Sequence, residues 1–224
     1  LYAAEALLRI HDKNGNFISP AEAIPILEES GLIIPVGKWI IQNAFSMCTE
    51  CRKYYPEFRV SINLSYVQIL KSPLMMELKQ MIDHSGISCS GIIVELTESG
   101  YLEGTPAVRS VWNDMKKLRI QIALDDFGTG YSNLMNISNL EPDIVKLDRG
   151  FTLKALSRSY EYQLMQYVIE MVHKLNQYVC VEGVETKEDL EKIKALGPDL
   201  IQGYYYSKPC SRDEFLKKFF GYSE

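Results

Sequence analysis

Short β-branched runs alternate with amphipathic segments along the chain, and this alternation limits the possible folds more than any other feature of the sequence. The runs are typical of strands, and the segments between them have helical periodicity. No linker, repeat or low-complexity tract interrupts the pattern. The alternation therefore predicts an α/β domain with a parallel sheet covered by helices. The predicted strands span residues 3–8, 58–63, 91–96, 120–124, 143–147, 178–181 and 199–202.

The segments between the predicted strands carry recognisable helix start signals. Ser19 is followed by Pro20, which places an N-cap residue before a proline at the first helical position. Thr186 and Ser211 each precede a segment that resembles a capping box, with an acidic residue three positions further on. These signals support the assignment of helices between the strands.

Polar residues stand where nearly every predicted strand ends. In a parallel barrel all of these ends face one mouth, where active sites are built. An open doubly wound sheet would gather a ligand at one switch point and use only some of its strands. The recurrence therefore favours a TIM-like (β/α) barrel, although only seven strands are visible and a closed barrel normally has eight. The residues concerned are Asn63, Glu95, Asp125, Asp126, Lys146, Glu182 and Gln202, with Glu5 inside the first strand.

Five of these side chains offer hard oxygen donors. Carboxylates gathered at one mouth repel each other unless a cation neutralises them. Mg²⁺ and Mn²⁺ prefer such ligands, whereas zinc prefers His or Cys. The adjacent pair of aspartates could reach two cations, as in many phosphodiester hydrolases. Alternatively, any single carboxylate could cap a helix or pair with a surface lysine. The candidate metal ligands are Glu5, Asn63, Glu95, Asp125 and Asp126.

Three further residues suggest hydrolytic chemistry. Lys146 closes an apolar run, so its side chain either snorkels to the surface or faces the mouth, where it could stabilise phosphate charge or orient a water. Glu182 follows another apolar run and could act as the base that activates a water. Arg9 could form a forked contact with a phosphate, and an ordinary surface ion pair is an equal alternative.

Composition excludes several other classes of protein. The chain has 24 basic and 29 acidic residues, for a formal net charge of −5, which argues against a nucleic-acid polymer as partner. It contains no run long and apolar enough to span a membrane. The 5 cysteines are an odd number in a chain that needs no disulfides, which favours a reducing cytoplasm. Cys48 and Cys51 form a CxxC pair within a helical pattern, and we interpret them as helix-face thiols rather than a zinc site.

The motifs also carry a resemblance to a known family. Taken in order along nearly the whole chain, they resemble the EAL domain, the bacterial cyclic di-GMP phosphodiesterase. One such motif would be weak, but the complete ordered set is specific. The matching segments are EALLR (5–9), ISPAE (18–22), SINLS (61–65), ELTE (95–98), DDFGTG (125–130), KLD (146–148), VEGVET (181–186) and QGY (202–204).

The resemblance implies a barrel with one antiparallel strand and a two-metal site that cuts cyclic di-GMP to linear pGpG with Mg²⁺ or Mn²⁺. It implies that the five oxygen-donor residues bind metal, with Asp126 reaching towards the second ion. Lys146 and Glu182 are then the catalytic residues that position and activate the attacking water. The substrate-binding residues implied are Leu7, Arg9 and Gln202.

Two further acidic residues are supporting residues by the same resemblance. Glu98 would anchor the loop that begins at Asp126, and Glu185 would complete the acidic side of the pocket. Departures from the family pattern are small: Ala4 replaces a usual glycine, Ile10 a usual tryptophan and Asn133 a common serine. None removes a ligand. Many family members lose site residues and serve only as cyclic di-GMP receptors, so the full set here favours catalysis.

The family also has a strand upstream of the EALLR motif, which is antiparallel and absent from this chain. We therefore expect residues 1–224 to be an N-terminally truncated EAL phosphodiesterase domain of a longer multidomain protein. About 20–30 preceding residues would supply the strand and its connection. By analogy we also expect a homodimer, an upstream GGDEF or sensor domain, and a cytoplasmic location. A non-cleaving cyclic di-GMP receptor and a pure interaction scaffold remain the alternatives.

Overall fold

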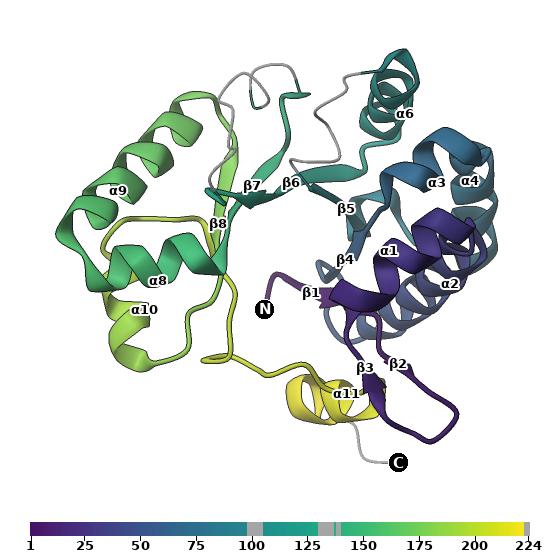
Figure 1. The fold of residues 1–224 in the computed structure, drawn as a ribbon, viewed down its shortest axis with the longest axis horizontal. Helices are drawn as coiled ribbons and strands as arrows, with labels where there is room; N and C mark the ends of the chain where they lie inside the picture. The colour runs from purple at the N-terminus through teal and green to yellow at the C-terminus, as the bar shows by residue number, and fades with distance from the viewer. Residues whose placement is uncertain (98–104, 130–136, 138–139, 222–224) are drawn as a thin grey trace. The chain divides into compact units, whose positions relative to one another are not determined.

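The computed structural model describes residues 1–97, 105–129, 137 and 140–221. The chain forms two compact units. Unit 1 comprises Leu1–Glu95, Glu103–Ile120 and Arg212–Glu224, and unit 2 comprises Leu96–Leu102 and Gln121–Ser211. Each unit contains parallel strands and the helices that cover them (Figure 1). The Glu98 and Asn133 side chains, considered above, lie outside the described residues.

Unit 1 contains three parallel strands in the order β1-β4-β5 and a separate two-stranded hairpin, β2-β3. Figure 1 shows α1 to α4 gathered along one side of these strands. The hairpin escaped prediction because its strands are only two residues long. The elements are β1 (Ala3–Ala6), β2 (Ile10–His11), β3 (Phe17–Ile18), α1 (Pro20–Ser30), α2 (Ile33–Cys51), β4 (Arg59–Asn63), α3 (Tyr66–Lys71), α4 (Leu74–Ser85), η1 (Cys89–Gly91), β5 (Ile92–Thr97), α6 (Pro106–Lys117) and α11 (Arg212–Phe220).

The predicted helix start at Ser19 is confirmed. Its side chain accepts a hydrogen bond from the Ala21 backbone N–H at 3.3 Å, and Pro20 occupies the first helical position. Gly31 ends α1 with φ 76°, a left-handed conformation that costs glycine little. Local sequence thus sets both ends of α1.

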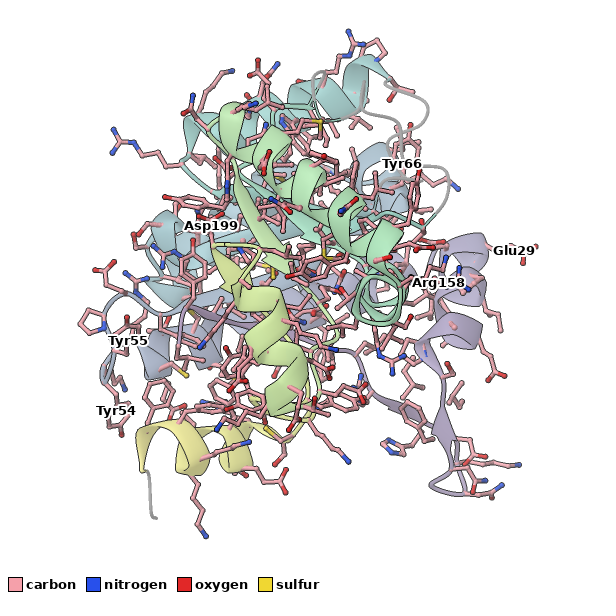
Figure 2. All side chains as sticks on the ribbon, turned by 90° about the vertical axis from the view of Figure 1, so that its left-hand side faces the viewer. Glu29, Tyr54, Tyr55, Tyr66, Arg158 and Asp199 are labelled. Carbon is pink, nitrogen blue, oxygen red and sulfur yellow. The ribbon has the colours of Figure 1, made fainter. Side chains whose placement is uncertain are left out.

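The final helix, α11, packs against the beginning of β4 through aromatic side chains. The ring centroids of Phe215 and Phe220 each lie 5.9 Å from that of Phe58, which is fully buried. Tyr54 extends this cluster, with its ring centroid 5.7 Å from that of Phe220; Figure 2 shows Tyr54 beside α11. An ion pair between Arg212 and Glu50 joins α11 to α2. The C-terminal segment therefore completes the core of unit 1.

The CxxC pair lies on α2, as the helical pattern predicts, and both thiols are buried. Burial raises the pKa of Cys48 to about 11 and that of Cys51 to about 12. Protonated, buried thiols are inert and pack as small apolar groups. Their interpretation as helix-face thiols agrees with this placement.

Unit 2 contains four parallel strands in the order β6-β7-β8-β9. Figure 1 shows α8, α9 and α10 on one side of β7 and β8. Thr186 begins α10 with the predicted capping box, in which Asp189 is the reciprocal partner. The elements are β6 (Gln121–Phe127), β7 (Ile144–Leu147), α8 (Arg149–Ser157), α9 (Ser159–Lys174), β8 (Tyr178–Val181), α10 (Lys187–Lys194) and β9 (Leu200–Ile201).

Strand β6 runs further than the sequence predicts, because it continues through both aspartates to Phe127. Its register with β7 shifts between Leu124 and Phe127, which marks a β-bulge. Asp126 lies inside this irregularity with φ 60°, a left-handed conformation that aspartate tolerates better than most side chains. The bulge breaks the alternation of the strand, so adjacent Asp125 and Asp126 do not follow a regular pleat.

The seven predicted strands correspond to β1, β4, β5, β6, β7, β8 and β9, with ends that differ by a few residues. Each strand pair described above among β1, β4 and β5 of unit 1, and among β6 to β9 of unit 2, is parallel, as the alternation predicts. Among the helices of the described ranges, none is both long and apolar enough to cross a membrane.

Candidate active site

In unit 1, the candidate metal ligands lie at the carboxyl ends of neighbouring strands. Parallel register pairs Glu5 of β1 with Ser61 of β4, and Asn63 of β4 with Glu95 of β5. The Asn63 Nδ2 donates a hydrogen bond to Glu5 Oε1 at 2.7 Å. The structure therefore brings the Asn63 amide and the Glu5 carboxylate together.

Glu95 is the deeply buried member of this group, with 3% of its surface exposed. Its Oε1 accepts a hydrogen bond from the hydroxyl of Ser61, which is also buried. A buried carboxylate requires such donors because desolvation otherwise disfavours its charge. Ser61 was missed from the sequence, although the SINLS segment contains it, because a small hydroxyl in mid-strand carries no distinctive signal.

In unit 2, the structure resolves the two alternatives for Lys146. Its side chain is only 4% exposed, and its Nζ lies 2.8 Å from Glu182 Oε1 and 3.1 Å from Asp125 Oδ1. Lys146 therefore does not snorkel to solvent. It lies between two carboxylates that come from the strands on either side of its own, β6 and the segment after β8.

The remaining acidic candidates of unit 2 differ in exposure. Glu185 is exposed and accepts hydrogen bonds from Arg149 Nη2 at 2.7 Å and Nε at 3.2 Å. Asp126 and Gln202 are half-buried, and Gln202 follows β9 directly. Arg149 was missed from the sequence because it follows the N-cap of α8, Asp148, and resembles an ordinary surface residue.

Arg9 and Leu7, the implied substrate contacts of unit 1, are both exposed. The Arg9 guanidinium donates to the Leu8 carbonyl at 2.9 Å, and its Cζ lies 5.9 Å from the centroid of the Phe17 ring. The contact with Phe17 joins Arg9 to the β2–β3 hairpin. Whether Arg9 contacts a phosphate or forms a surface ion pair stays a prediction.

The candidate ligands of both units fit the metal that the sequence implies. Glu5, Asn63 and Glu95 in unit 1 and Asp125 and Asp126 in unit 2 offer oxygen donors alone, which fits Mg²⁺ or Mn²⁺ and not zinc. Within the described part of the chain, no three His, Cys, Asp or Glu side chains converge into a metal-binding cluster. The fit therefore rests on donor chemistry and on the shared placement at strand ends.

The chain is an α/β protein whose parallel strands are covered by helices. Acidic, amide and lysine groups lie at the carboxyl ends of these strands, and such groups suit hydrolytic chemistry. A family model described as EAL domain matches residues 1–209. The chain belongs to the EAL domain family, which confirms the resemblance seen in its motifs.

Curated relatives agree with this assignment. The cyclic di-GMP phosphodiesterase PdeF of Escherichia coli is 32% identical over 92% of this chain and 27% of its own length. PdeR of the same organism, also named a cyclic di-GMP phosphodiesterase, is 32% identical over 92% of this chain and 31% of its own. The chain thus spans about a third or less of these relatives, whose named enzyme class is the one that the sequence predicts.

Solved structures give the same answer for the fold. The EAL enzyme Bd1971, in a form with cAMP and cyclic di-GMP bound, superimposes with a TM-score of 0.91 at 30% identity, over 97% of this chain and 60% of that one. The MucR phosphodiesterase in complex with c-di-GMP has a TM-score of 0.87 at 27% identity, over 95% of this chain and 86% of that one. The predicted fold class, a TIM-like α/β barrel, is confirmed.

Proposed function

We propose that this chain is a metal-dependent phosphodiesterase that hydrolyses cyclic di-GMP to linear pGpG. The observation that carries the proposal is the buried Lys146 ion-paired with both Asp125 and Glu182. A lysine held between two strand-end carboxylates is suited to a reaction at an anionic phosphodiester. The hard oxygen donors of unit 1 and the enzyme class named for PdeF and PdeR support the same conclusion.

Two divalent cations, Mg²⁺ or Mn²⁺, would supply charge neutralisation and a more acidic water when bound. Glu5, Asn63, Glu95 and Asp125 would hold them, with Asp126 as a further ligand. These residues match the chemistry of the ions, and each lies at or next to the carboxyl end of a strand. Their role as ligands is the part of the proposal that metal titration tests directly.

The reaction itself assigns roles to unit 2. Glu182 would accept a proton from water as the water oxygen attacks phosphorus. The bond from phosphorus to the 3′ oxygen breaks, the leaving oxygen takes a proton, and a 5′-phosphate remains on linear pGpG. Lys146 would orient the attacking water and stabilise charge on the phosphate oxygens. Arg9, Leu7 and Gln202 would contact substrate, while Glu185, ion-paired with Arg149, would support the pocket and Glu98 its loop.

The decisive experiment is to incubate the purified protein with cyclic di-GMP and Mn²⁺ and to identify the product by mass spectrometry. We expect a single product heavier than the substrate by one water. Binding of the nucleotide without a product would support the alternative, a cyclic di-GMP receptor. Absence of binding would leave an interaction scaffold.

Metal dependence provides a second test. We expect Mg²⁺ or Mn²⁺ to support hydrolysis and excess EDTA to abolish it. Ca²⁺ should bind without supporting turnover, because its larger and looser coordination would misplace the attacking water. Full activity in EDTA would refute the metal mechanism.

The protein's wider organisation is also part of the proposal. MucR of Pseudomonas aeruginosa, 27% identical over 96% of this chain and 32% of its own length, is named a bifunctional diguanylate cyclase and phosphodiesterase. By analogy with such relatives, we predict an upstream cyclase or sensor domain for this protein. We also predict a homodimer and a cytoplasmic location. The molecular masses of the purified chain and of the full-length protein in solution test the homodimer and the upstream domain.

A further inference from the structure

Three consecutive residues at the end of β4 are each tied to a different element of unit 1. The Asn63 side chain bonds to Glu5 of β1, as described above. The Leu64 backbone N–H donates to the Glu95 carbonyl of β5 at 3.0 Å. The Ser65 hydroxyl donates to the Glu28 carboxylate of α1 at 2.6 Å. The third tie connects the candidate ligands to a helix that contributes no residue to them.

Ser65 also begins α3. Its hydroxyl accepts from the Val67 N–H at 3.1 Å, and its own N–H donates to Gln68 Oε1 at 3.1 Å, which completes a capping box. The single hydroxyl therefore serves as the cap of α3 and as the donor to Glu28. Because its extended backbone, with φ −76° and ψ 141°, directly follows Leu64, its position limits the direction in which β4 ends.

Gln68 is fixed by close packing against α2. It is 4% exposed, and a Cβ placed on Gly37 of α2 would lie 2.1 Å from its Nε2. No side chain larger than hydrogen fits at Gly37 unless Gln68 moves. The far side of α3 is held as well, since the Tyr66 hydroxyl lies 3.4 Å from Thr105 Oγ1 at the N-cap of α6; Figure 2 labels Tyr66.

We propose that Glu28 and Ser65 form a clamp that positions Asn63 for metal binding. Glu28 holds Ser65, Ser65 fixes the turn after β4, and the turn sets where the Asn63 amide lies relative to Glu5. A carboxylate acceptor makes the link stronger than a neutral hydrogen bond. Glu28 and Ser65 are positioning residues, because neither contacts the reacting groups. The clamp rests on the proposed function, in which Asn63 is a metal ligand.

The test measures Mn²⁺ bound to the purified chain by electron paramagnetic resonance, without substrate. Loss of one hydrogen bond corresponds to roughly a three- to tenfold change in an equilibrium constant. We expect Glu28→Ala and Ser65→Ala each to raise the Mn²⁺ dissociation constant by about that factor. Because the two side chains act through one contact, the double variant should be weakened by less than the product of the two single effects.

Conservative and matched variants separate positioning from helix stability. Glu28→Gln and Ser65→Thr keep an acceptor and a hydroxyl, so their Mn²⁺ affinity should lie within about twofold of wild type. Ser72→Ala removes the hydroxyl of the C-cap residue of α3, which donates to the Gln68 carbonyl at 2.7 Å, and should leave Mn²⁺ affinity unchanged. Glu28→Ala removes the clamp while the cap of α3 stays intact, so its effect cannot come from lost capping.

The outcomes distinguish the clamp from the proposed function. If Asn63→Ala binds Mn²⁺ more weakly while Glu28→Ala and Ser65→Ala bind it as wild type does, the clamp is wrong and the function stands. If Ser72→Ala weakens Mn²⁺ binding as much as Ser65→Ala does, a general loss of stability in α3 explains the effect and the clamp is wrong. If the wild-type chain does not bind Mn²⁺, the proposed function fails and the clamp fails with it.

Discussion

The strand-end carboxylates of the two units accept from donors that differ in charge. In unit 1, Glu5 accepts from the Asn63 amide and Glu95 from the Ser61 hydroxyl, and both donors are neutral. In unit 2, Asp125 and Glu182 contact the Lys146 ammonium. A neutral donor satisfies an oxygen lone pair without adding positive charge, whereas the lysine offsets one of its two negative neighbours.

In the proposed function, this difference separates Glu5 and Glu95, which would bind metal, from Glu182, which would act as the base. Asp125 belongs to both groups, because it contacts Lys146 and would also bind metal. A neutral hydrogen-bond donor leaves the negative charge of a carboxylate in place, and a metal ligand needs that charge. A general base and a group that orients a phosphate need partners held at fixed positions. A lysine that is ion-paired with two carboxylates meets this need. The comparison predicts that the same residue types at equivalent strand ends take different roles where their hydrogen-bond donors differ in charge.

The largest expected effect comes from Lys146→Ala. It leaves Asp125 and Glu182 without the ammonium that lies between them, and removal of one partner from a buried ion pair costs about 3–5 kcal/mol. We expect the free energy of unfolding to fall by about that amount and turnover to be lost, as measured by urea denaturation and the product assay.

Lys154→Ala, an exposed lysine of α8 in the same unit, is the matched control and should leave both properties unchanged. Wild-type stability and turnover in Lys146→Ala would remove the distinction between the two units.

Glu182→Gln tests the role of the base with a smaller structural change. The amide retains the shape of the carboxylate and can still accept from Lys146, but it cannot take a proton from water. We expect turnover to fall by at least ~10²-fold, the range typical of a lost general base, while Mn²⁺ and substrate still bind. Normal hydrolysis would assign the base to Lys146 or to the metal site instead.

Asn63→Ala tests the other side of the comparison. It removes an exposed amide of unit 1 and its hydrogen bond to Glu5, so we expect Mn²⁺ affinity to fall by about tenfold, equivalent to 1.4 kcal/mol. Stability should change by only about 1 kcal/mol, the net value of one hydrogen bond. A metal titration together with thermal unfolding separates the two effects. Unchanged Mn²⁺ affinity would show that Asn63 is not a ligand.

Most of the framework could be predicted from the sequence because its signals are local. Alternation of strand and helix patterns located the strands, and Ser19 and Thr186 marked helix starts that the structure confirms. The β2–β3 hairpin was missed because two-residue strands give no periodicity. The bulge in β6 was missed because the left-handed conformation of Asp126 depends on the register with β7 rather than on the nearby sequence.

The site could be predicted only as a set of residues. The sequence left the direction of Lys146 open because all four residues of β7 are buried, so alternation cannot distinguish its two faces. Ser61 and Glu28 were missed because their partners, Glu95 and Ser65, lie 34 and 37 residues away in the chain. Contacts over such separations are set by strand register and helix packing, which no local pattern encodes.

The smallest expected effect concerns an exposed pair in unit 2, Arg149 with Glu185. Its side chains are 58% and 37% exposed, so solvent screens their attraction despite a shortest contact of 2.7 Å. We expect Arg149→Ala to change the free energy of unfolding by less than about 0.5 kcal/mol in urea denaturation. Lys117→Ala, which breaks an exposed pair with Asp114 in unit 1, is the matched control and should have an equally small effect. Equal changes in the free energy of unfolding for the two variants would show that the units differ in their strand-end contacts and not in their exposed ion pairs. A loss of about 2 kcal/mol or more in Arg149→Ala alone would instead extend that difference to the surface around Glu185.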